Sequence, residues 1–110
     1  IDVVWKFGPY SIKSAFEIEN STSIYSGILR LSDVKTETPD SVFPLYIVAP
    51  EEKKRKVFNE LQRPTFGESG LKLNKIVKYL GYDKVRELDA QVNGNELSFD
   101  DLDRAAESVN

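Results

Sequence analysis

The sequence predicts an α/β fold in which a mixed β-sheet is flanked by helices on its faces. Segments with the two-residue alternation of strands alternate along the chain with segments that carry the apolar stripe of helices. One of the strands contains the unbroken apolar run Leu45-Tyr46-Ile47-Val48, which is typical of a central strand covered on both faces. The length of 110 residues fits one domain.

The N-terminal part of the chain predicts a hairpin followed by a helix. Two strands, over residues 1–7 and 11–19, are separated by the turn signal Gly8-Pro9. A Ser or Thr within residues 21–23 then caps a helix that runs to about residue 33. Apolar residues recur in it at i, i+4 and i+7, and the stripe is wide, so we expect this helix to be largely buried.

Proline and turn residues delimit the rest. A polar loop over residues 35–43 precedes the apolar strand at 44–49, and Pro50 opens a helix at its first position that ends before Pro64. Beyond it, the pattern predicts a strand over 75–80, a helix over 83–92, a turn at 93–94 and a last helix from Ser98.

The composition excludes several classes of chemistry. The chain has no Cys and no His, which excludes disulfides, Cys/His zinc sites, Ser-His-Asp triads and Cys nucleophiles within it. Acid–base chemistry must therefore come from carboxylates, Lys, Tyr or metal-bound water. No apolar run approaches the roughly 20 residues of a membrane span, and no signal peptide is visible, so we expect a cytoplasmic protein.

The charge is unevenly distributed. The net charge is −3, but residues 81–110 hold three basic and eight acidic side chains, whereas residues 1–80 hold twelve basic and ten acidic ones. The basic run Lys53-Lys54-Arg55-Lys56 can follow a phosphate backbone. We favour the simpler interpretation, a solvated helix face balanced by nearby acids, which are Glu51, Glu52 and Glu60.

Three acidic residues form the candidate site. Glu17 and Glu19 alternate with Phe16 and Ile18 on a predicted strand, so the two carboxylates share one face. Asp2 lies on the preceding strand, and the hairpin can bring it alongside. Three carboxylates on neighbouring strands offer the hard oxygen ligands that Mg²⁺ needs. The alternative is a solvated face of a half-exposed sheet, which any amphipathic strand shows.

This arrangement resembles the PD-(D/E)xK nuclease superfamily, which contains restriction endonucleases. An Asp on an Ile-Asp-Val-Val strand, a hairpin and then Glu-x-Glu carry the resemblance, and the order strand, strand, helix, strand, helix, strand extends it to about residue 80. Asp2 and Glu17 match the metal-binding acids, and Glu19 stands where most members carry Lys. Lys6 and Lys13 are nearby cations that can replace that Lys.

The resemblance implies a single domain over residues 1–110, with a restriction-endonuclease-like core at 1–80 and an acidic helical part at 81–110. Because the chain lacks Met and opens within a strand, we expect a C-terminal fragment of a longer protein with an N-terminally truncated core. The implied function is Mg²⁺-dependent DNA cleavage, with Mn²⁺ as a substitute cofactor and Asp2, Glu17 and Glu19 as metal ligands and catalytic residues. The implied partners are DNA, the rest of the polypeptide and a second copy in a homodimer.

Two alternatives remain open. The first is a non-catalytic module with a degenerate nuclease fold that binds DNA or a protein. The second is a small regulatory or interaction domain without a link to nucleic acids.

Overall fold

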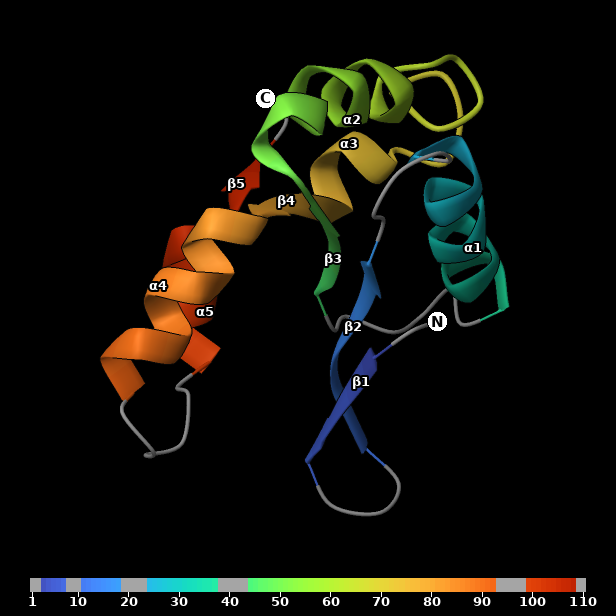
Figure 1. The fold of residues 1–110 in the computed structure, drawn as a ribbon. Helices are drawn as coiled ribbons and strands as arrows, with labels where there is room; N and C mark the ends of the chain where they lie inside the picture. The colour runs from blue at the N-terminus through green and yellow to red at the C-terminus, as the bar shows by residue number, and fades with distance from the viewer. Residues whose placement is uncertain (1–2, 8–10, 19–23, 38–43, 93–98, 109–110) are drawn as a thin grey trace.

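The computed structural model describes residues 3–7, 11–18, 24–37, 44–92 and 99–108. They form a five-stranded sheet with helices on both faces (Figure 1), which confirms the predicted α/β fold with a mixed, helix-flanked sheet. The elements in chain order are β1 (Val3–Phe7), β2 (Ser11–Ile18), α1 (Ile24–Glu37), β3 (Leu45–Ala49), the 3₁₀-helix η1 (Glu51–Lys53), α2 (Lys54–Leu61), α3 (Leu73–Ile76), β4 (Val77–Gly81), α4 (Tyr82–Val92), α5 (Phe99–Ala105) and β5 (Glu107–Ser108).

The sheet follows the chain from one edge to the other, in the order β1-β2-β3-β4-β5. The three middle strands are parallel, and β1 and β5 pair antiparallel at the edges. The two crossovers between parallel strands advance in the same direction, so their helices lie over the same face. This face carries α1 and α2, and the other carries α4 and α5 (Figure 1).

Each face has its own apolar core. Side chains alternate along β3, so that Leu45, Ile47 and Ala49 belong to the core under α1 and α2, and Tyr46 and Val48 to the core next to α5. All five residues of β3 are buried, which confirms the central strand that the apolar run predicts. The stripe of α1, formed by Ile24, Ile28 and Leu31, packs into the first core as expected.

Some boundaries differ from the prediction, and α3 and β5 are elements that the sequence did not predict. Helix α1 continues to Glu37, past the predicted end near residue 33. Within it, Ser32 Oγ donates to Leu29 O (2.6 Å) and Thr36 Oγ1 donates to Ser32 O (2.8 Å), so these hydroxyls bond to the helix backbone. The strand predicted from residue 75 begins at Val77, because the short helix α3 precedes it. Strand β5 has two residues and was not predicted.

Within the part of the chain that the structure describes, every helix is too short or too polar to cross a bilayer.

Candidate active site

Glu17 lies near the carboxyl end of the first parallel strand, β2. It pairs in register with Ile47 of β3, which in turn pairs with Tyr79 of β4, so the three side chains form a row across the sheet on the α1 and α2 face. The side chain of Glu17 has an exposed fraction of 0%. Ligands of open α/β sheets bind beyond the carboxyl ends of parallel strands. Glu17 is therefore a buried acid near the end of the sheet where such sites form.

Arg30 of α1 is the cation next to this acid. Its Nε donates a hydrogen bond to Glu17 Oε1 at 2.6 Å, and its side chain is 47% exposed. The position follows from the packing of α1, since Arg30 borders the apolar stripe between Ile28 and Leu31 and so lies at the margin of the covered face. A buried carboxylate is costly unless it is paired, and a hydrogen bond between two charged groups is among the strongest available. The pair explains how Glu17 is accommodated.

Burial corrects the alternative interpretation of this strand for Glu17. A solvated strand face is wrong at this position, because the Glu17 side chain is fully covered. On the opposite face of the strand, Phe16 is buried but Ile18 is 44% exposed. Asp2 and Glu19 lie outside the described residues, as do the side chains of Lys6 and Lys13. The site of three carboxylates therefore stays a prediction.

Carboxylate oxygens are suitable ligands for Mg²⁺, so Glu17 fits the chemistry of a divalent-cation site. One of its oxygens is already held by Arg30. Within the described residues, acidic side chains do not gather into a group of three or more that could hold a metal. A complete metal site thus depends on Asp2 and Glu19.

A second acid and cation meet on the opposite face. Asp103 of α5 accepts hydrogen bonds through Oδ1 from Lys78 Nζ (2.9 Å) and from the Tyr46 hydroxyl (2.7 Å). These two donors, Lys78 first, hold the pKa of Asp103 below its ordinary value. Burial, and then the bond to Asp103, raise the pKa of Tyr46. The cluster joins α5 to two strands and is fully explained as a structural contact.

The ends of β3 and β4 are tied to the following helices. The Tyr79 hydroxyl donates to Ala49 O (3.2 Å), and burial followed by the negative charge of Glu51 raises the pKa of Tyr79 to about 12. Glu51 Oε2 accepts the Asp83 amide at 2.9 Å. A Cβ at Gly81 would lie 2.1 Å from this carboxylate oxygen, so a larger residue there would displace the end of the Glu51 side chain.

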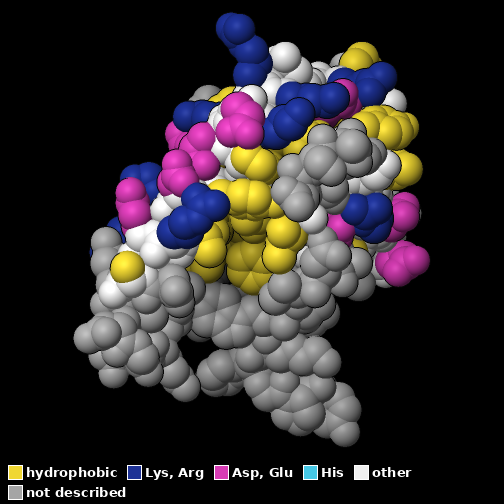
Figure 2. All heavy atoms as spheres, viewed as in Figure 1, with side chains coloured by type: hydrophobic (Ala, Val, Ile, Leu, Met, Phe, Trp, Pro, Cys, Tyr) yellow, Lys and Arg dark blue, Asp and Glu magenta, His cyan; other side chains and the backbone are white. Residues whose placement is uncertain are grey.

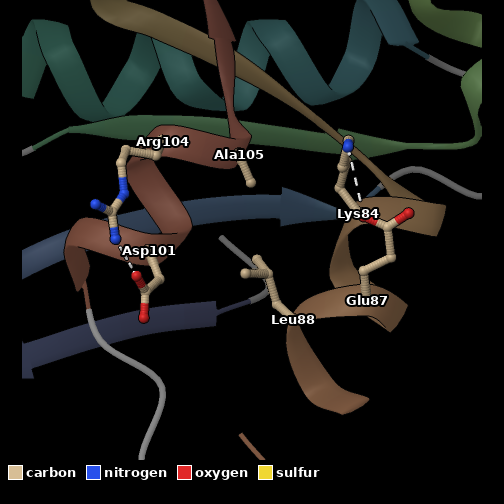
Figure 3. Close-up of a pocket in the computed structure, with 6 residues that line it drawn as sticks. All are labelled: Lys84, Glu87, Leu88, Asp101, Arg104 and Ala105. Atoms are coloured by element: carbon tan, nitrogen blue, oxygen red, sulfur yellow. Dashed lines mark hydrogen bonds and ion pairs between the residues drawn. The ribbon is translucent and has the colours of Figure 1, made fainter. Parts of the chain in front are cut away.

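A hollow of about 300 Å³ lies between α4 and α5. Figure 3 shows Leu88 and Ala105 at its apolar wall, with Lys84 paired to Glu87 on one helix and Arg104 paired to Asp101 on the other. Its charges are matched within each helix, and it is on the face of the sheet opposite Glu17 (Figure 1). This hollow therefore offers no chemistry to the candidate site.

Lys and Arg side chains gather over α2, at the top of the view in Figure 2. Lys54 pairs with Glu107 at 2.7 Å, but Lys53, Arg55 and Lys56 form no ion pair with any described residue. Two of the three acids expected to balance them have other contacts. Glu51 accepts the amide of Asp83, and Glu60 pairs with Arg63 at 2.8 Å.

Comparison with known proteins decides the family. The family described as the Type II restriction enzyme NmeDI C-terminal domain matches residues 1–109 of this chain. The chain belongs to this family. A curated relative, the Type II restriction enzyme NmeDI of Neisseria meningitidis serogroup C, is 33% identical over 89 residues. The matched region covers 80% of this chain and 24% of the relative. No solved structure matches the chain.

Membership confirms the resemblance at the level of restriction enzymes, and therefore a link to restriction systems. The PD-(D/E)xK motif and its Glu-x-Glu variant stay predictions. The residue that sequence reasoning missed is Arg30. An Arg beside the apolar stripe of a helix that directly follows an acidic strand was the available signal.

Proposed function

We propose that this domain carries the catalytic centre of a Type II restriction enzyme and hydrolyses phosphodiester bonds of DNA with Mg²⁺. The chain spans about a quarter of the curated relative, 24% of its length, so the domain would act together with the remainder of a longer polypeptide. A homodimer is the assembly we propose, because a second copy would place a second centre on the other DNA strand.

The observation that carries this proposal is the fully buried, Arg-paired carboxylate of Glu17 near the carboxyl end of a parallel strand. Val3 of β1 lies opposite Phe16 of β2 in an antiparallel register. Asp2 and Glu17 are the next residues outward from this pair. Directly opposed residues of an antiparallel pair point to the same face. A register that continues by one residue would therefore place Asp2 beside Glu17.

Asp2, Glu17 and Glu19 would hold the metal, with Mn²⁺ as a substitute. When bound, Mg²⁺ would lower the pKa of a coordinated water and neutralise charge on the phosphodiester. The chain itself fixes Glu17, because β2 sets its backbone and Arg30 holds Oε1. Glu19 either completes a site for a second ion or accepts the proton of the attacking water. The covering helix α1 excludes bulk water from the Glu17 side chain.

The test is cleavage of plasmid DNA by the intact enzyme, with Glu17→Gln as the decisive variant. The amide keeps the shape of the side chain but loses its charge, so we expect cleavage to fall by at least about a hundredfold with the fold retained, and to stop in chelator. Glu87→Gln is the matched control, because Glu87 is an exposed acid paired with Lys84 on the opposite face. Wild-type cleavage by Glu17→Gln would refute the catalytic proposal.

The second candidate function is a DNA-binding module without catalysis. It is favoured by Lys53, Arg55 and Lys56 on α2, whose charges no described acid neutralises. The same experiment separates the two functions. A non-catalytic module would bind DNA equally well as wild type and as Glu17→Gln, and neither Glu17→Gln nor Glu87→Gln would change the cleavage contributed by other parts of the enzyme.

A further inference from the structure

The side chain of Arg30 extends from a buried contact into solvent. Its Nε, the guanidinium nitrogen nearest the main chain, is 2.6 Å from Glu17 Oε1, while 47% of the side chain is exposed and Glu17 is fully covered. A guanidinium is a planar fork with five N–H donors, and its geometry suits phosphate as well as carboxylate. Arg30 therefore has the reach to hold the acid on its inner side and an anion on its outer side.

The other described arginines differ from Arg30 in their partners. Three of them pair with an acid that lies three residues earlier in the chain. These pairs are Arg63 with Glu60, Arg86 with Asp83 and Arg104 with Asp101. Arg30 instead reaches an acid thirteen residues away on another element, and that acid is buried. Among the arginines that the structure describes, Arg30 alone joins the interior of the sheet to the surface.

We propose that Arg30 binds a phosphate group of the DNA strand at the Glu17 site. This inference rests on the proposed function, because the partner is the DNA of a restriction enzyme and the phosphate lies next to the proposed catalytic carboxylate. Arg30 and Glu17 together are neutral. A divalent cation on the carboxylates would leave the site positive, and an anionic backbone would then be attracted to the exposed side of the guanidinium. Arg30 thus supplies, from α1, a cation for a motif that has Glu19 in the usual position of Lys.

The competing explanation is that Arg30 only neutralises the buried charge of Glu17. Single substitution of Arg30 does not separate the two explanations, because it leaves an uncompensated buried carboxylate and destabilises the domain. Glu17→Gln removes that demand. Replacement of a buried ion pair by neutral side chains of similar volume is commonly tolerated, so the double variant Glu17→Gln/Arg30→Gln is the suitable comparison.

The experiment measures binding of a short fluorescent DNA duplex of mixed sequence to the intact enzyme by anisotropy, with Ca²⁺ as the divalent cation and over a range of salt concentrations. We expect Glu17→Gln to bind at least as tightly as wild type, since a negative charge is lost. The double variant should bind about tenfold more weakly than Glu17→Gln, and its salt slope should be smaller by about 0.9, the value for one phosphate contact. Arg86→Gln, which removes an exposed Arg of α4, is the matched control and should change neither quantity.

The outcomes are distinct from those of the catalytic test. Equal affinity and equal salt slope for the double variant and for Glu17→Gln, with both variants folded by thermal melting, would overturn the role of Arg30 even if Glu17 proves essential for cleavage. A loss of affinity of the double variant relative to wild type, whose net charge it shares, would support it even if Glu17→Gln still cleaves and the catalytic proposal fails. Affinity of the double variant equal to that of wild type would overturn it. Absence of duplex binding by the wild-type enzyme at low salt would also overturn it.

Discussion

The two faces of the sheet use an acid and a cation in opposite ways. On the α1 face the acid is Glu17 of a strand and the cation comes from a helix, whereas on the α5 face the acid is Asp103 of a helix and the donors Lys78 and Tyr46 come from strands. The side chain of Asp103 is 34% exposed, and that of Glu17 is 0% exposed. Both contacts join a helix to the sheet, but only one places a charge wholly inside.

This difference is the reason for proposing a function for Glu17 rather than for Asp103. A contact that merely attaches a helix works with a half-exposed acid and two donors, as Asp103 demonstrates. Full burial of Glu17 imposes a desolvation cost that packing alone does not require, since an apolar residue would fit the row with Ile47 and Tyr79. Positions where a sequence departs from such local rules are commonly functional, because the departure is retained for activity at the expense of stability.

The largest effect that separates the two faces is expected from Arg30→Met. This substitution leaves the buried charge of Glu17 without its guanidinium partner. We therefore expect the free energy of unfolding to fall by about 3 kcal/mol. This value is at the lower end for a broken buried ion pair, because Arg30 is half exposed. Urea denaturation measures it. Addition of Glu17→Gln should recover more than half of the loss. If the double variant is as unstable as Arg30→Met, the cost comes from lost packing of the long side chain rather than from the charge.

A smaller effect is expected on the other face, from Asp103→Ala. It leaves the hydroxyl of fully buried Tyr46 without this acceptor, and we expect a loss of about 2 kcal/mol. Tyr46→Phe removes the hydroxyl but keeps the ring stacked on Phe16, whose centroid is 5.1 Å away, and should cost about 1 kcal/mol. A loss for Asp103→Ala that exceeds that of Arg30→Met would contradict the comparison of the two faces.

The sequence predicts the interior of this fold better than its polar contacts. The apolar run of β3 identifies a central strand because a parallel strand between two helical layers has no polar side to expose. Strand β5 could not be predicted, since its two residues are ordered by pairing with Lys78 and Tyr79 of β4, far away in the sequence. Glu17 was singled out from the alternation of its strand, but its burial depends on the packing of α1, which local alternation does not contain.

The smallest expected effect is the pH dependence of the Asp103 cluster. Its two donors lower the pKa of Asp103 below the ordinary value of 3.8, so the folded state binds this proton more weakly than the unfolded chain does. The stabilisation by ionised Asp103 is therefore fully present above about pH 4–5, and it is lost as the pH falls through the pKa of the folded state.

Urea midpoints of wild type and Asp103→Asn should differ by a constant amount at higher pH and converge below about pH 4. Lys78→Met should make this loss smaller, and raise the pH at which it is complete, more than Tyr46→Phe does, because Lys78 is the larger cause of the lowered folded-state pKa. Wild-type and Asp103→Asn curves that stay parallel down to acid unfolding would show that this carboxylate, partly open to solvent, adds nothing through its charge. Of the two acid–cation contacts compared, only the one between Glu17 and Arg30 would then have a role for its charge.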